Sequence, residues 1–436
     1  MANCGCTTAM ASTRIVCSIC SHAANLLIAG HQVRCAFSCV ESGSYLAIPK
    51  CLWLERWRFA YILGDLHQAA IIVLFQLHDR QKRVDSEGGH VEPIGNWFQF
   101  FARSPPLSQL PSLLSLRDFS LKFKGQPACV VENVDLTVAS GEILCIVGES
   151  GCGKSVTAMA LMGLLPPDAA KILSGTMSFN GKTIDMTRER IPASMRGGDM
   201  AMIFQEPMTS LNPAFRIGDQ IAEAVQQHKG CTRAEGRARA LEMLRRVGLP
   251  SPEQRLDQYP HQLSGGQRQR IMIAMALAND PKLLIADEPT TALDVTIQAQ
   301  ILELIRDLQR DTGMGTIMIT HDLGVVAEIA DTVVVMYGGQ MVERGPMAEV
   351  FEDPQHPYTI GLMASVPRLS GPRARLTTIE GTVPSIEAMP EGCRFRTRCA
   401  FAAPICATRP QLVDVTNDHG VACHFAPLEQ NLKVAG

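Results

Sequence analysis

The pattern of apolar and polar residues changes about a quarter of the way along the chain. Residues 1–111 keep no sustained period of two or 3.6 residues. Beyond them, apolar positions alternate over Leu114–Leu116 and Leu121–Phe123, and again over Asn133–Val138, which predicts two strands of an antiparallel edge layer. Ile143–Val147 is apolar throughout and predicts a buried strand that ends in a glycine-rich turn.

Helix signals follow in the middle of the chain. Thr232 and Glu235 have the spacing of a capping box, which predicts the start of a helix, and Gly248 predicts its end. The apolar face of this helix is expected at Ala238, Leu241, Leu244 and Val247.

A second helix and several strands are expected further on. The helix is predicted over Val295–Gln309. Its apolar stripe is expected at Ile297, Ile301, Leu304 and Leu308. Apolar runs at 283–286, 316–319 and 333–336 predict strands. Strands alternating with helices at this spacing indicate an α/β fold with a parallel sheet covered on both faces.

Composition sets the first 111 residues apart from the rest. Seven of the fifteen cysteines lie in the first 51 residues, and all three tryptophans precede residue 100. They are Cys4, Cys6, Cys17, Cys20, Cys35, Cys39 and Cys51, with Trp53, Trp57 and Trp97. We interpret residues 1–111 as a mispredicted upstream start or a poorly ordered extension. A chain that begins near Ser112 is therefore expected to keep its full function.

Charge and hydropathy narrow the class of protein. The chain has 40 Lys and Arg against 43 Asp and Glu, so no basic excess favours a nucleic-acid partner. No run of 18 uninterrupted apolar residues is present, and the best candidate, Phe59–Leu77, contains Asp65 and His67. The chain itself is not expected to span a membrane.

The turn after Val147 carries the clearest chemistry. Gly148–Ser155, here called the phosphate loop, reads G-x4-G-K-S, follows a predicted strand and precedes a helical pattern. Backbone N–H groups of such a loop surround phosphates, Lys154 neutralises the β- and γ-phosphates, and Ser155 offers a hydroxyl to Mg²⁺. The predicted nucleotide-binding residues of this region are Gly148, Glu149, Ser150, Gly151, Cys152, Gly153, Lys154, Ser155 and Val156.

Two details of this region are less typical. Val156 stands directly after Ser155, where a second hydroxyl residue could follow the first. It is expected to contribute its backbone N–H instead. Cys152 lies near a helix N-terminus, which favours a thiolate. A redox switch at Cys152 and a tolerated small side chain are both open interpretations.

The apolar run at 283–286 ends in two carboxylates. Asp287 suits a Mg²⁺-bound water, because a carboxylate at the end of a buried strand near the phosphate loop can reach the ion. Glu288 is then free to orient and deprotonate the attacking water. A solvated acidic pair at a strand end is the alternative.

Leu263–Gln267, here called the signature segment, reads LSGGQ about twenty residues before that strand. Ser-Gly-Gly before a helix is a second anion-binding terminus, and two such termini in one chain suggest a site completed by another chain. The sequence here resembles the ATP-binding-cassette (ABC) ATPases, in which each phosphate loop is capped by the partner cassette. The residues that match the family's signature are Ser264, Gly265, Gly266 and Gln267.

The resemblance extends from about Leu114 to Glu349 and assigns further roles. It implies that Gln205 senses Mg²⁺, that Asp294 crosses the dimer interface and that His321 contacts the γ-phosphate. Phe123 is the candidate for stacking on adenine, with a plain apolar role in the edge layer as the alternative. The expected catalytic residues are Glu288, His321, Gln205 and Lys154, and those near Mg²⁺ are Ser155, Gln205 and Asp287.

The fold implied by the resemblance is a P-loop NTPase with an antiparallel β edge layer and a helical subdomain. The cassette is expected over residues 112–350, with the helical subdomain at about 206–274 docking on membrane subunits. A small cysteine-containing extension is expected over 351–427, here called the C-terminal extension, and a tail over 428–436.

Two short segments resemble one branch of the family. Tyr259–His261 and Pro354–Thr359 look like the ATPase subunits of peptide and nickel uptake systems. The resemblance implies an ATP-hydrolysing subunit that energises import of di- or oligopeptides. Nickel, glutathione and murein peptides are alternative cargoes, and a repair or translation ATPase is the alternative class.

The C-terminal extension contains four cysteines without a C-x2-C pair, namely Cys393, Cys399, Cys406 and Cys423. Their long spacers suit the corners of a 4Fe–4S iron–sulfur cluster better than a zinc knuckle. Members of the peptide branch are thought to hold such a cluster there. Zinc, with His419 or His424 nearby, and free or disulfide-paired thiols stay open.

The same resemblance implies partners and a location. Two permease subunits, a second and different cassette chain, and an extracytoplasmic binding protein are expected, without nucleic acid. The chain is expected at the cytoplasmic face of the inner membrane, with ATP and Mg²⁺ bound.

Overall fold

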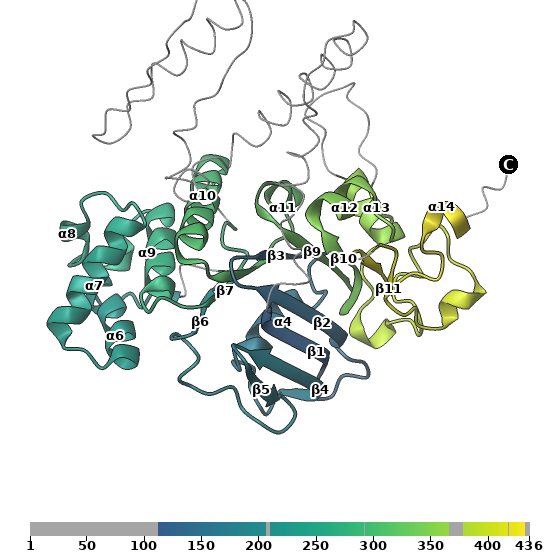
Figure 1. Ribbon diagram of the computed structural model, residues 1–436, viewed down its shortest axis with the longest axis horizontal. Helices are drawn as coiled ribbons and strands as arrows, with labels where there is room; N and C mark the ends of the chain where they lie inside the picture. Colours follow the sequence, from purple (N-terminus) through teal and green to yellow (C-terminus); the bar gives the residue numbers. More distant parts are fainter. Residues whose placement is uncertain (1–111, 206–209, 292, 366–377, 417, 432–436) are drawn as a thin grey trace, which may run out of the picture. The chain divides into compact units, whose positions relative to one another are not determined.

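A computed structural model describes residues 112–205, 210–291, 293–365, 378–416 and 418–431 of the chain. The interpretation of residues 1–111 concerns a segment outside these described residues. The described residues form two sheets with helices around them (Figure 1). The first strand begins at Ser112, where the apolar alternation begins in the sequence.

The smaller sheet is the expected antiparallel layer, in the order β2-β1-β4-β5. Its strands are β1 (Ser112–Phe123), β2 (Val131–Ala139), β4 (Ala170–Phe179) and β5 (Lys182–Asp185). The two alternating runs expected before residue 124 form the single strand β1, whose register shifts between Leu116 and Phe119. This irregularity explains why the alternation breaks there in the sequence.

The larger sheet has the order β11-β12-β10-β9-β3-β8-β7-β6. Its strands are β3 (Ile143–Val147), β6 (Met200–Ile203), β7 (Leu283–Asp287), β8 (Gly315–Ile319), β9 (Thr332–Tyr337), β10 (Gln340–Pro346), β11 (Val413–Asp414) and β12 (Gly420–Val421). The strands from β9 to β6 are parallel, and β10, β12 and β11 are antiparallel to their neighbours. The predicted parallel sheet is thus confirmed for β3, β7, β8 and β9.

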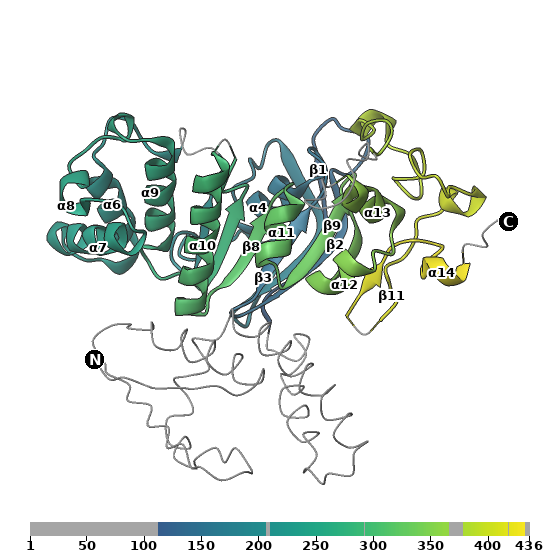
Figure 2. The ribbon, with the colours of Figure 1, turned by 90° about the horizontal axis from the view of Figure 1, so that it is seen from above.

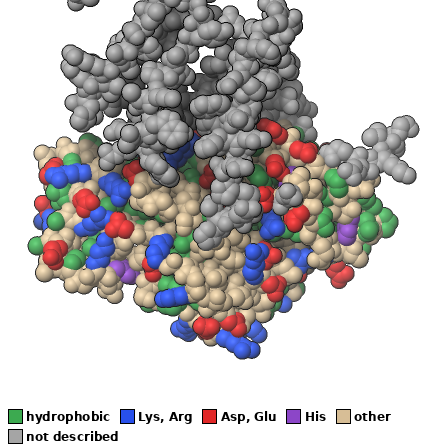
Figure 3. All heavy atoms as spheres, viewed as in Figure 1, with side chains coloured by type: hydrophobic (Ala, Val, Ile, Leu, Met, Phe, Trp, Pro, Cys, Tyr) green, Lys and Arg blue, Asp and Glu red, His purple; other side chains and the backbone are tan. Residues whose placement is uncertain are grey.

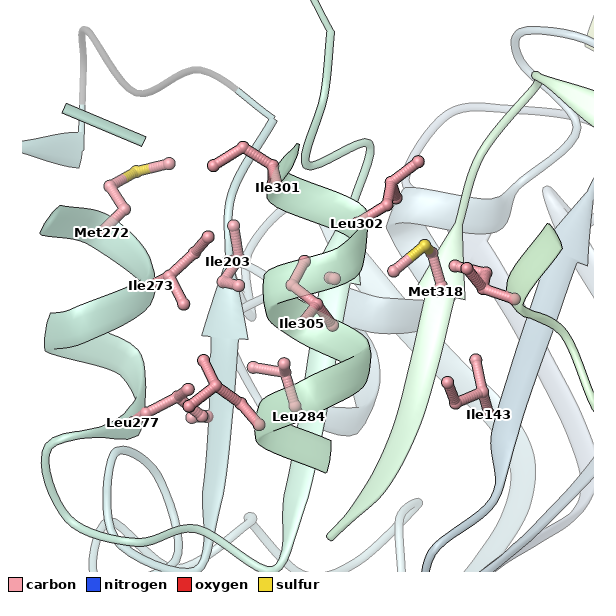
Figure 4. Close-up of a cluster of buried hydrophobic side chains, with 14 of the residues drawn as sticks. Ile143, Ile203, Met272, Ile273, Leu277, Leu284, Ile301, Leu302, Ile305 and Met318 are labelled. Carbon is pink, nitrogen blue, oxygen red and sulfur yellow. The ribbon is translucent and has the colours of Figure 1, made fainter. Parts of the chain in front are cut away.

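Both faces of this sheet are buried, as its uniformly apolar strands predict. In β3, Ile143 and Cys145 join one apolar cluster, whereas Leu144 and Ile146 join the other. One cluster includes side chains of the smaller sheet, and the other includes side chains of the helices beyond the opposite face. Figure 4 shows part of the latter, where Ile203 of a strand is drawn between Ile273 and Ile305 of two helices.

Helices cover the larger sheet and extend beyond it. They are α4 (Lys154–Leu161), α6 (Ile217–Lys229), α7 (Arg233–Arg246), α8 (Pro252–Arg255), α9 (Gly265–Leu277), α10 (Val295–Thr312), α11 (Leu323–Ile329), α12 (Met347–Glu352), α13 (Pro357–Ala364) and α14 (Leu428–Asn431). Helices α6 to α9 form a helical group at one end of the larger sheet, and the C-terminal extension lies at the other end (Figure 2).

Helix α7 begins with the predicted capping box, but its buried face differs from the expected one. Ala238 is exposed, while Gly236, Ala240, Met243 and Leu244 are buried. The reason is that α7 packs against both α6 and α9. A Cβ at Gly236 would lie 3.0 Å from the Ala222 carbonyl oxygen, so glycine allows α6 to approach closely.

Helix α10 extends slightly beyond its predicted end, to Thr312. Its buried residues are Ile301, Leu302, Ile305, Leu308 and Gln309, so the expected stripe omitted Leu302 and Ile305. Ile297 and Leu304 are only partly buried, because the stripe that meets α9 and the sheet is rotated from the predicted one.

The C-terminal extension joins the cassette by adding β12 and β11 to the edge of β10. The buried Glu343 carboxylate fixes this junction, because it accepts hydrogen bonds from the backbone N–H groups of Gln355 (2.7 Å) and His356 (3.0 Å) and contacts Nε2 of His419 at 2.7 Å. Leu428 is buried, and its N–H donates to Gln355 Oε1 at 2.9 Å.

Surface charge is mixed on the face that Figure 3 displays, where basic and acidic side chains alternate over the helical group and the sheets. Arg237, for example, pairs with both Asp219 and Asp257. Among the described helices, none combines the length and apolarity that a membrane crossing requires.

Candidate functional site

The phosphate loop follows β3 and wraps over the start of α4. Gly148, Gly151 and Gly153 have φ values of 148°, 81° and 93°, a region that favours glycine. A Cβ at Gly148 would overlap the Met336 carbonyl oxygen, and one at Gly153 would lie 2.8 Å from Val131 Cγ2. The loop therefore lies directly on its neighbouring strands. Backbone conformation favours glycine at all three positions, and lack of space also requires it at Gly148 and Gly153.

Lys154 is held inside this loop. Its side chain is only 6% exposed, and Nζ donates hydrogen bonds to the carbonyl oxygens of Gly148 (2.7 Å) and Glu149 (3.0 Å). Within the described residues, no side chain caps the N-terminus of α4, where Gly153 is the N-cap. An ammonium group and uncapped backbone N–H groups thus converge where an anion is favoured.

Asp287, at the end of β7, faces the start of α4. Ser155 Oγ donates to Asp287 Oδ1 at 3.0 Å, and Asp287 is 5% exposed. Burial raises the pKa of Asp287, and the nearby charge of Glu288 adds to this, while the hydrogen bond from Ser155 opposes it. A cation at this position would remove the cost of the buried charge.

Glu288 lies at the centre of a hydrogen-bond network. Its carboxylate accepts from Gln205 Nε2 (2.9 Å) and Thr291 Oγ1 (2.8 Å), and lies 3.2 Å from His321 Nδ1. Burial alone would raise the pKa of Glu288, but the hydrogen bonds of Thr291 and His321, with the charges of His321 and Lys154, lower it overall. Glu288 has a φ of 45°, a strained value that often accompanies functional positions.

These groups meet at a cavity of about 370 Å³. Of the predicted residues, those lining it are Phe123, Ser150, Gly151, Gly153, Lys154, Ser155, Val156, Gln205 and Glu288. Further lining residues, which the sequence reasoning missed, are Gln126, Val130, Gly338, Val383, Pro384, Ile386 and Met389. Gly148, Glu149 and Asp287 contact the lining through hydrogen bonds to Lys154 and Ser155.

Thr291 was also missed, although it holds the Glu288 carboxylate. It comes three residues after Glu288, and a hydroxyl at that spacing after an acidic strand end was the available signal. Phe123 is partly buried at the end of β1, where it lines the cavity as the adenine-stacking hypothesis requires.

The signature segment lies elsewhere. Ser264 caps α9, because its Oγ accepts from the Gln267 N–H at 3.4 Å and Gln267 Oε1 accepts from the Ser264 N–H at 3.1 Å. A Cβ at Gly266 would lie 2.9 Å from Ile297 Cγ2, so the segment adjoins the start of α10. Asp294 caps that helix by accepting from the Ile297 N–H at 3.0 Å. Among the described residues that line the cavity, none comes from the signature segment.

Cys152 does not fit the expectation of a thiolate. Its side chain is fully buried, and burial raises the pKa of the thiol although Lys154, 3.6 Å from Sγ, opposes this. The helix N-terminus fails to stabilise a thiolate because the sulfur faces the protein interior rather than solvent. A protonated thiol that fills space inside the loop agrees with the structure.

The four cysteines of the C-terminal extension are brought together. Cys393, Cys399, Cys406 and Cys423 are free thiols that line one cavity of about 10 Å³, with His424 beside them. His419 is instead bound to Glu343. Burial raises the pKa of Cys393, Cys399 and Cys423, and the neighbouring thiols add to this. Even so, the described residues contain no group of three or more His, Cys, Asp or Glu side chains arranged closely enough to hold a metal ion.

Two family descriptions match parts of the chain. Residues 131–291 match the ABC transporter family, and residues 342–406 match the C-terminal region of oligopeptide and dipeptide transporters. The first match contains the phosphate loop, the signature segment and Glu288. The second begins within β10 and contains Cys393, Cys399 and Cys406.

Individual relatives extend this likeness over most of their length. The chain is 49% identical to the dipeptide transport ATP-binding protein DppD of Bacillus subtilis over 72% of this chain and 95% of the relative. It is 47% identical to DppD of Haemophilus influenzae over 73% of this chain and 97% of that protein. Among solved structures, cbiO1 of Clostridium perfringens, part of the transporter complex cbiONQ, is 29% identical with a TM-score of 0.48, covering 56% of this chain and 91% of that one.

Proposed function

This chain belongs to the ABC transporter family, and on that premise we propose that it is the ATP-hydrolysing subunit that energises import of di- and oligopeptides through a membrane permease. The observation that carries the proposal is the joint match of cassette and C-terminal region to peptide-transport ATP-binding proteins, at 49% identity over 95% of one relative. The cavity beside the phosphate loop supports the ATPase role.

In this proposal the phosphate loop binds the ATP phosphates. Lys154 and the N–H groups at the start of α4 contact the phosphate oxygens, and the ammonium group exchanges its present carbonyl partners for them. Ser155 and Asp287 fit Mg²⁺ as oxygen ligands, Asp287 through a water molecule, because a buried carboxylate beside a hydroxyl is a suitable donor set. Bound Mg²⁺ would neutralise charge on the phosphates.

Glu288 is proposed as the general base. The lowered pKa of its carboxyl keeps it ionised at neutral pH, and its three neighbours fix the orientation of its oxygens. Gln205 and His321 both contact Glu288, which supports a role for them at the phosphate end of the ligand. We propose that Gln205 reports on the cation and His321 on the γ-phosphate.

The exposed signature segment is proposed to act on another chain. Its position outside the cavity supports a head-to-tail pair in which the Ser264 end of α9 covers the phosphate loop of the partner cassette. Asp294, at the start of α10, is proposed to cross the same interface. A related but different chain is the proposed partner.

The remaining partners and the location follow from the family. Importers of this kind work with two permease subunits and an extracytoplasmic binding protein, so we propose that the chain docks on the cytoplasmic face of the inner membrane. The helical group α6–α9, which covers most of the proposed subdomain 206–274 of a cassette at 112–350 and extends to Leu277, is the proposed docking region. Residues 351–427 are proposed as a distinct C-terminal extension, with 428–436 following it.

A second proposal concerns the thiols that share one cavity. We propose that Cys393, Cys399, Cys406 and Cys423 bind a 4Fe–4S cluster, since four thiols form its usual ligand set. The present cavity of about 10 Å³ is smaller than a cubane, so binding requires the thiols to move apart. Anaerobic expression should yield a coloured protein containing iron and sulfide, and Cys406→Ser should lose both. A colourless protein with stoichiometric zinc would instead support the zinc alternative.

Transport is tested in a strain that lacks the chromosomal copy. Wild-type protein should restore uptake of a labelled dipeptide. The Glu288→Gln variant should not restore uptake, although the cells contain equal amounts of the two proteins. Labelled nickel, glutathione and murein tripeptide serve as parallel cargoes. Restoration of one of these without dipeptide uptake would overturn the peptide assignment, and restoration by Glu288→Gln would overturn the ATPase coupling.

A further inference from the structure

The nucleotide cavity has a wall formed by residues of the C-terminal extension, outside the proposed cassette at 112–350. Val383, Pro384, Ile386 and Met389 line it together with the phosphate loop and Phe123. They lie on an irregular segment with one short 3-10 helix, Ile386–Ala388. We call residues 383–389 the apolar wall. It contrasts with the polar lining formed by Lys154, Gln205 and Glu288.

Met389 lies close to the turn between β9 and β10, which itself contacts the loop that precedes β2. A Cβ at Gly338 would lie 3.5 Å from Met389 Sδ, and one at Gly339 would overlap the Val130 carbonyl group. The same Val130 carbonyl oxygen would lie 3.1 Å from a Cβ at Gly153 in the phosphate loop. Met389, Gly338, Val130 and Gly153 are thus successive neighbours along the cavity, which places the apolar wall beside the phosphate loop.

Arg398 fastens this wall to the phosphate loop. Its Nη1 donates to both carboxylate oxygens of Glu149, at 3.0 and 3.1 Å. On its other side, Nε donates to the Glu380 carbonyl oxygen at 2.9 Å and Nη2 to the Gly381 carbonyl oxygen at 3.1 Å. The side chain is 6% exposed. One buried guanidinium therefore joins the second residue of the phosphate loop to the residues that enter the apolar wall.

Two further residues of the C-terminal extension, Tyr358 and Arg394, hold it against the cassette. The Glu149 N–H donates to the hydroxyl of Tyr358 at 2.9 Å. Arg394 donates to the Cys129 carbonyl oxygen at 3.1 Å, to Glu132 Oε2 at 2.6 Å and to the Gly338 carbonyl oxygen. The C-terminal extension thus contacts both the phosphate loop and the β1–β2 loop, and residues of both loops line the cavity.

We propose that the apolar wall is part of the nucleotide-binding site, where Ile386 and Met389 contact the adenosine portion of ATP or ADP, and that Arg398 is the positioning residue that holds the wall on the phosphate loop. The inference rests on the proposed function as an ATPase. Apolar side chains facing Phe123 suit a flat base with little charge, whereas the polar end suits phosphates. Nucleotide binding and docking of the wall then favour each other by the same factor.

The first test separates the two ends of the ligand. The double variant Ile386→Ala/Met389→Ala of the full chain should bind ADP–Mg²⁺ roughly tenfold more weakly, because two apolar contacts with adenosine are lost. Competition by inorganic pyrophosphate, which lacks adenosine, should be unchanged. Ile405→Ala is the matched control, because Ile405 belongs to the same extension but is 52% exposed. Unchanged ADP affinity in a folded double variant would overturn the proposal.

The second test needs no substitution in the wall. Saturating ADP–Mg²⁺ should slow amide hydrogen exchange in residues 379–389 of the wild-type chain, and pyrophosphate should slow it less. If ADP protects the phosphate loop but leaves 379–389 unchanged, the wall is not linked to the nucleotide. This measurement also decides the matter if the double variant fails to fold.

The third test concerns Arg398. Arg398→Ala and Glu149→Gln should each weaken ADP binding several-fold, and the double variant should be no weaker than the single ones, because both remove the same link. Arg398→Lys should recover part of the affinity. ADP should no longer protect residues 379–389 in Arg398→Ala. Additive losses, or protection that persists, would remove Arg398 from the positioning role.

These outcomes are distinct from a failure of the proposed function. A wild-type chain that binds neither ADP nor ATP would contradict the ATPase itself. A wild-type chain that binds ADP with normal affinity, but whose wall variants and exchange pattern do not respond, would contradict only the inference about the wall.

Discussion

The starts of α4 and α9 are both glycine-rich turns that lead into helices, yet their N–H groups meet different partners. At α4 the N-cap is Gly153, without a side-chain cap, and a buried Lys154 lines a cavity. At α9 the side chains of Ser264 and Gln267 cap the turn reciprocally on an exposed surface. We call the start of α4 open, because its N–H groups are available to a ligand in this chain's own cavity. We call the start of α9 closed, because its own side chains occupy its N–H groups unless another molecule approaches.

This difference explains how one chain can carry two anion-binding motifs without forming two cavities. A capping box satisfies two of the N–H groups that an anion would otherwise use. The glycine N-cap of α4 leaves them free, and burial of the ammonium group beside them concentrates positive charge. The sequence motif alone does not distinguish these states, but the capping partners do.

Removal of the charge at the open start should have the largest effect. Lys154→Ala should weaken ATP binding and lower hydrolysis about 10³-fold, because the lysine contacts phosphate both before and during transfer. Lys182→Ala, on the exposed strand β5, is the matched control. Equilibrium binding and phosphate release measure the two effects. Normal nucleotide affinity in Lys154→Ala would mean that the α4 start is not the phosphate site.

Removal of the base next to the open start should leave binding intact. Glu288→Gln should lower kcat at least ~10²-fold while ATP affinity stays within a few-fold of wild type, because the amide keeps the shape but cannot accept the proton. Glu303→Gln, on the exposed face of α10, should have no effect. Turnover at the wild-type rate would assign the base to another residue.

The closed start should matter only when two chains meet. Ser264→Ala should leave ATP affinity of the isolated chain unchanged, lower turnover of the assembled complex roughly tenfold, and destabilise α9 by about 1 kcal/mol through loss of the cap. Ser264→Asn keeps a capping side chain, so it should retain stability but still lose turnover. An equal loss of affinity in the isolated chain would erase the distinction between the two starts.

A third helix start, that of α13, is also capped by a side chain, and here the capping side chain can be protonated. His356 is buried, and its Nδ1 accepts from the Tyr358 N–H at 3.1 Å, which requires the neutral ring. Burial lowers the pKa of His356 to about 4, against about 6.5 in an unfolded chain. Between pH 4 and pH 6.5, His356 is therefore protonated in the unfolded chain but neutral in the folded chain. Its contribution to stability is fully present above pH 6.5 and declines as the pH falls towards 4.

The measurement is thermal unfolding across this pH range. Lowering the pH to 5.5 should cost about 1 kcal/mol of stability at this site. His356→Asn keeps an N-cap acceptor but removes the titration, so its unfolding temperature should fall less between pH 7 and pH 5.5. Parallel pH profiles for wild type and His356→Asn would show that another group controls the acid response.

The sequence predicted those parts of the fold that depend on local pattern. The bounds of β3, the start of α10 and the capping box of α7 follow from apolar runs and capping residues a few positions apart. The buried face of α7 does not, because the exposure of Ala238 is set by α6 and α9 rather than by the helix itself.

The same distinction applies to the site. The phosphate loop is one continuous run of residues, and the two carboxylates at the end of β7 are adjacent in sequence. Each could therefore be recognised from its local pattern. Arg398 is 249 residues away from its partner Glu149, and an isolated arginine near a cysteine carries no sequence signal for that contact. Of the two interpretations of Cys152, the small buried side chain agrees with the structure and the thiolate does not, since a helix N-terminus is visible in sequence but the burial of a sulfur is not.

The pairing of β12 with β10 has a consequence for handling the protein. Without the C-terminal extension, β10 would become the free edge of an eight-stranded sheet reduced to six strands, with its unpaired backbone groups exposed. Free edges of this kind recruit strands from other molecules and promote aggregation. A shortened chain that ends near residue 350 would therefore also need a new means of avoiding aggregation through this edge, such as a bulge or a charged side chain along β10.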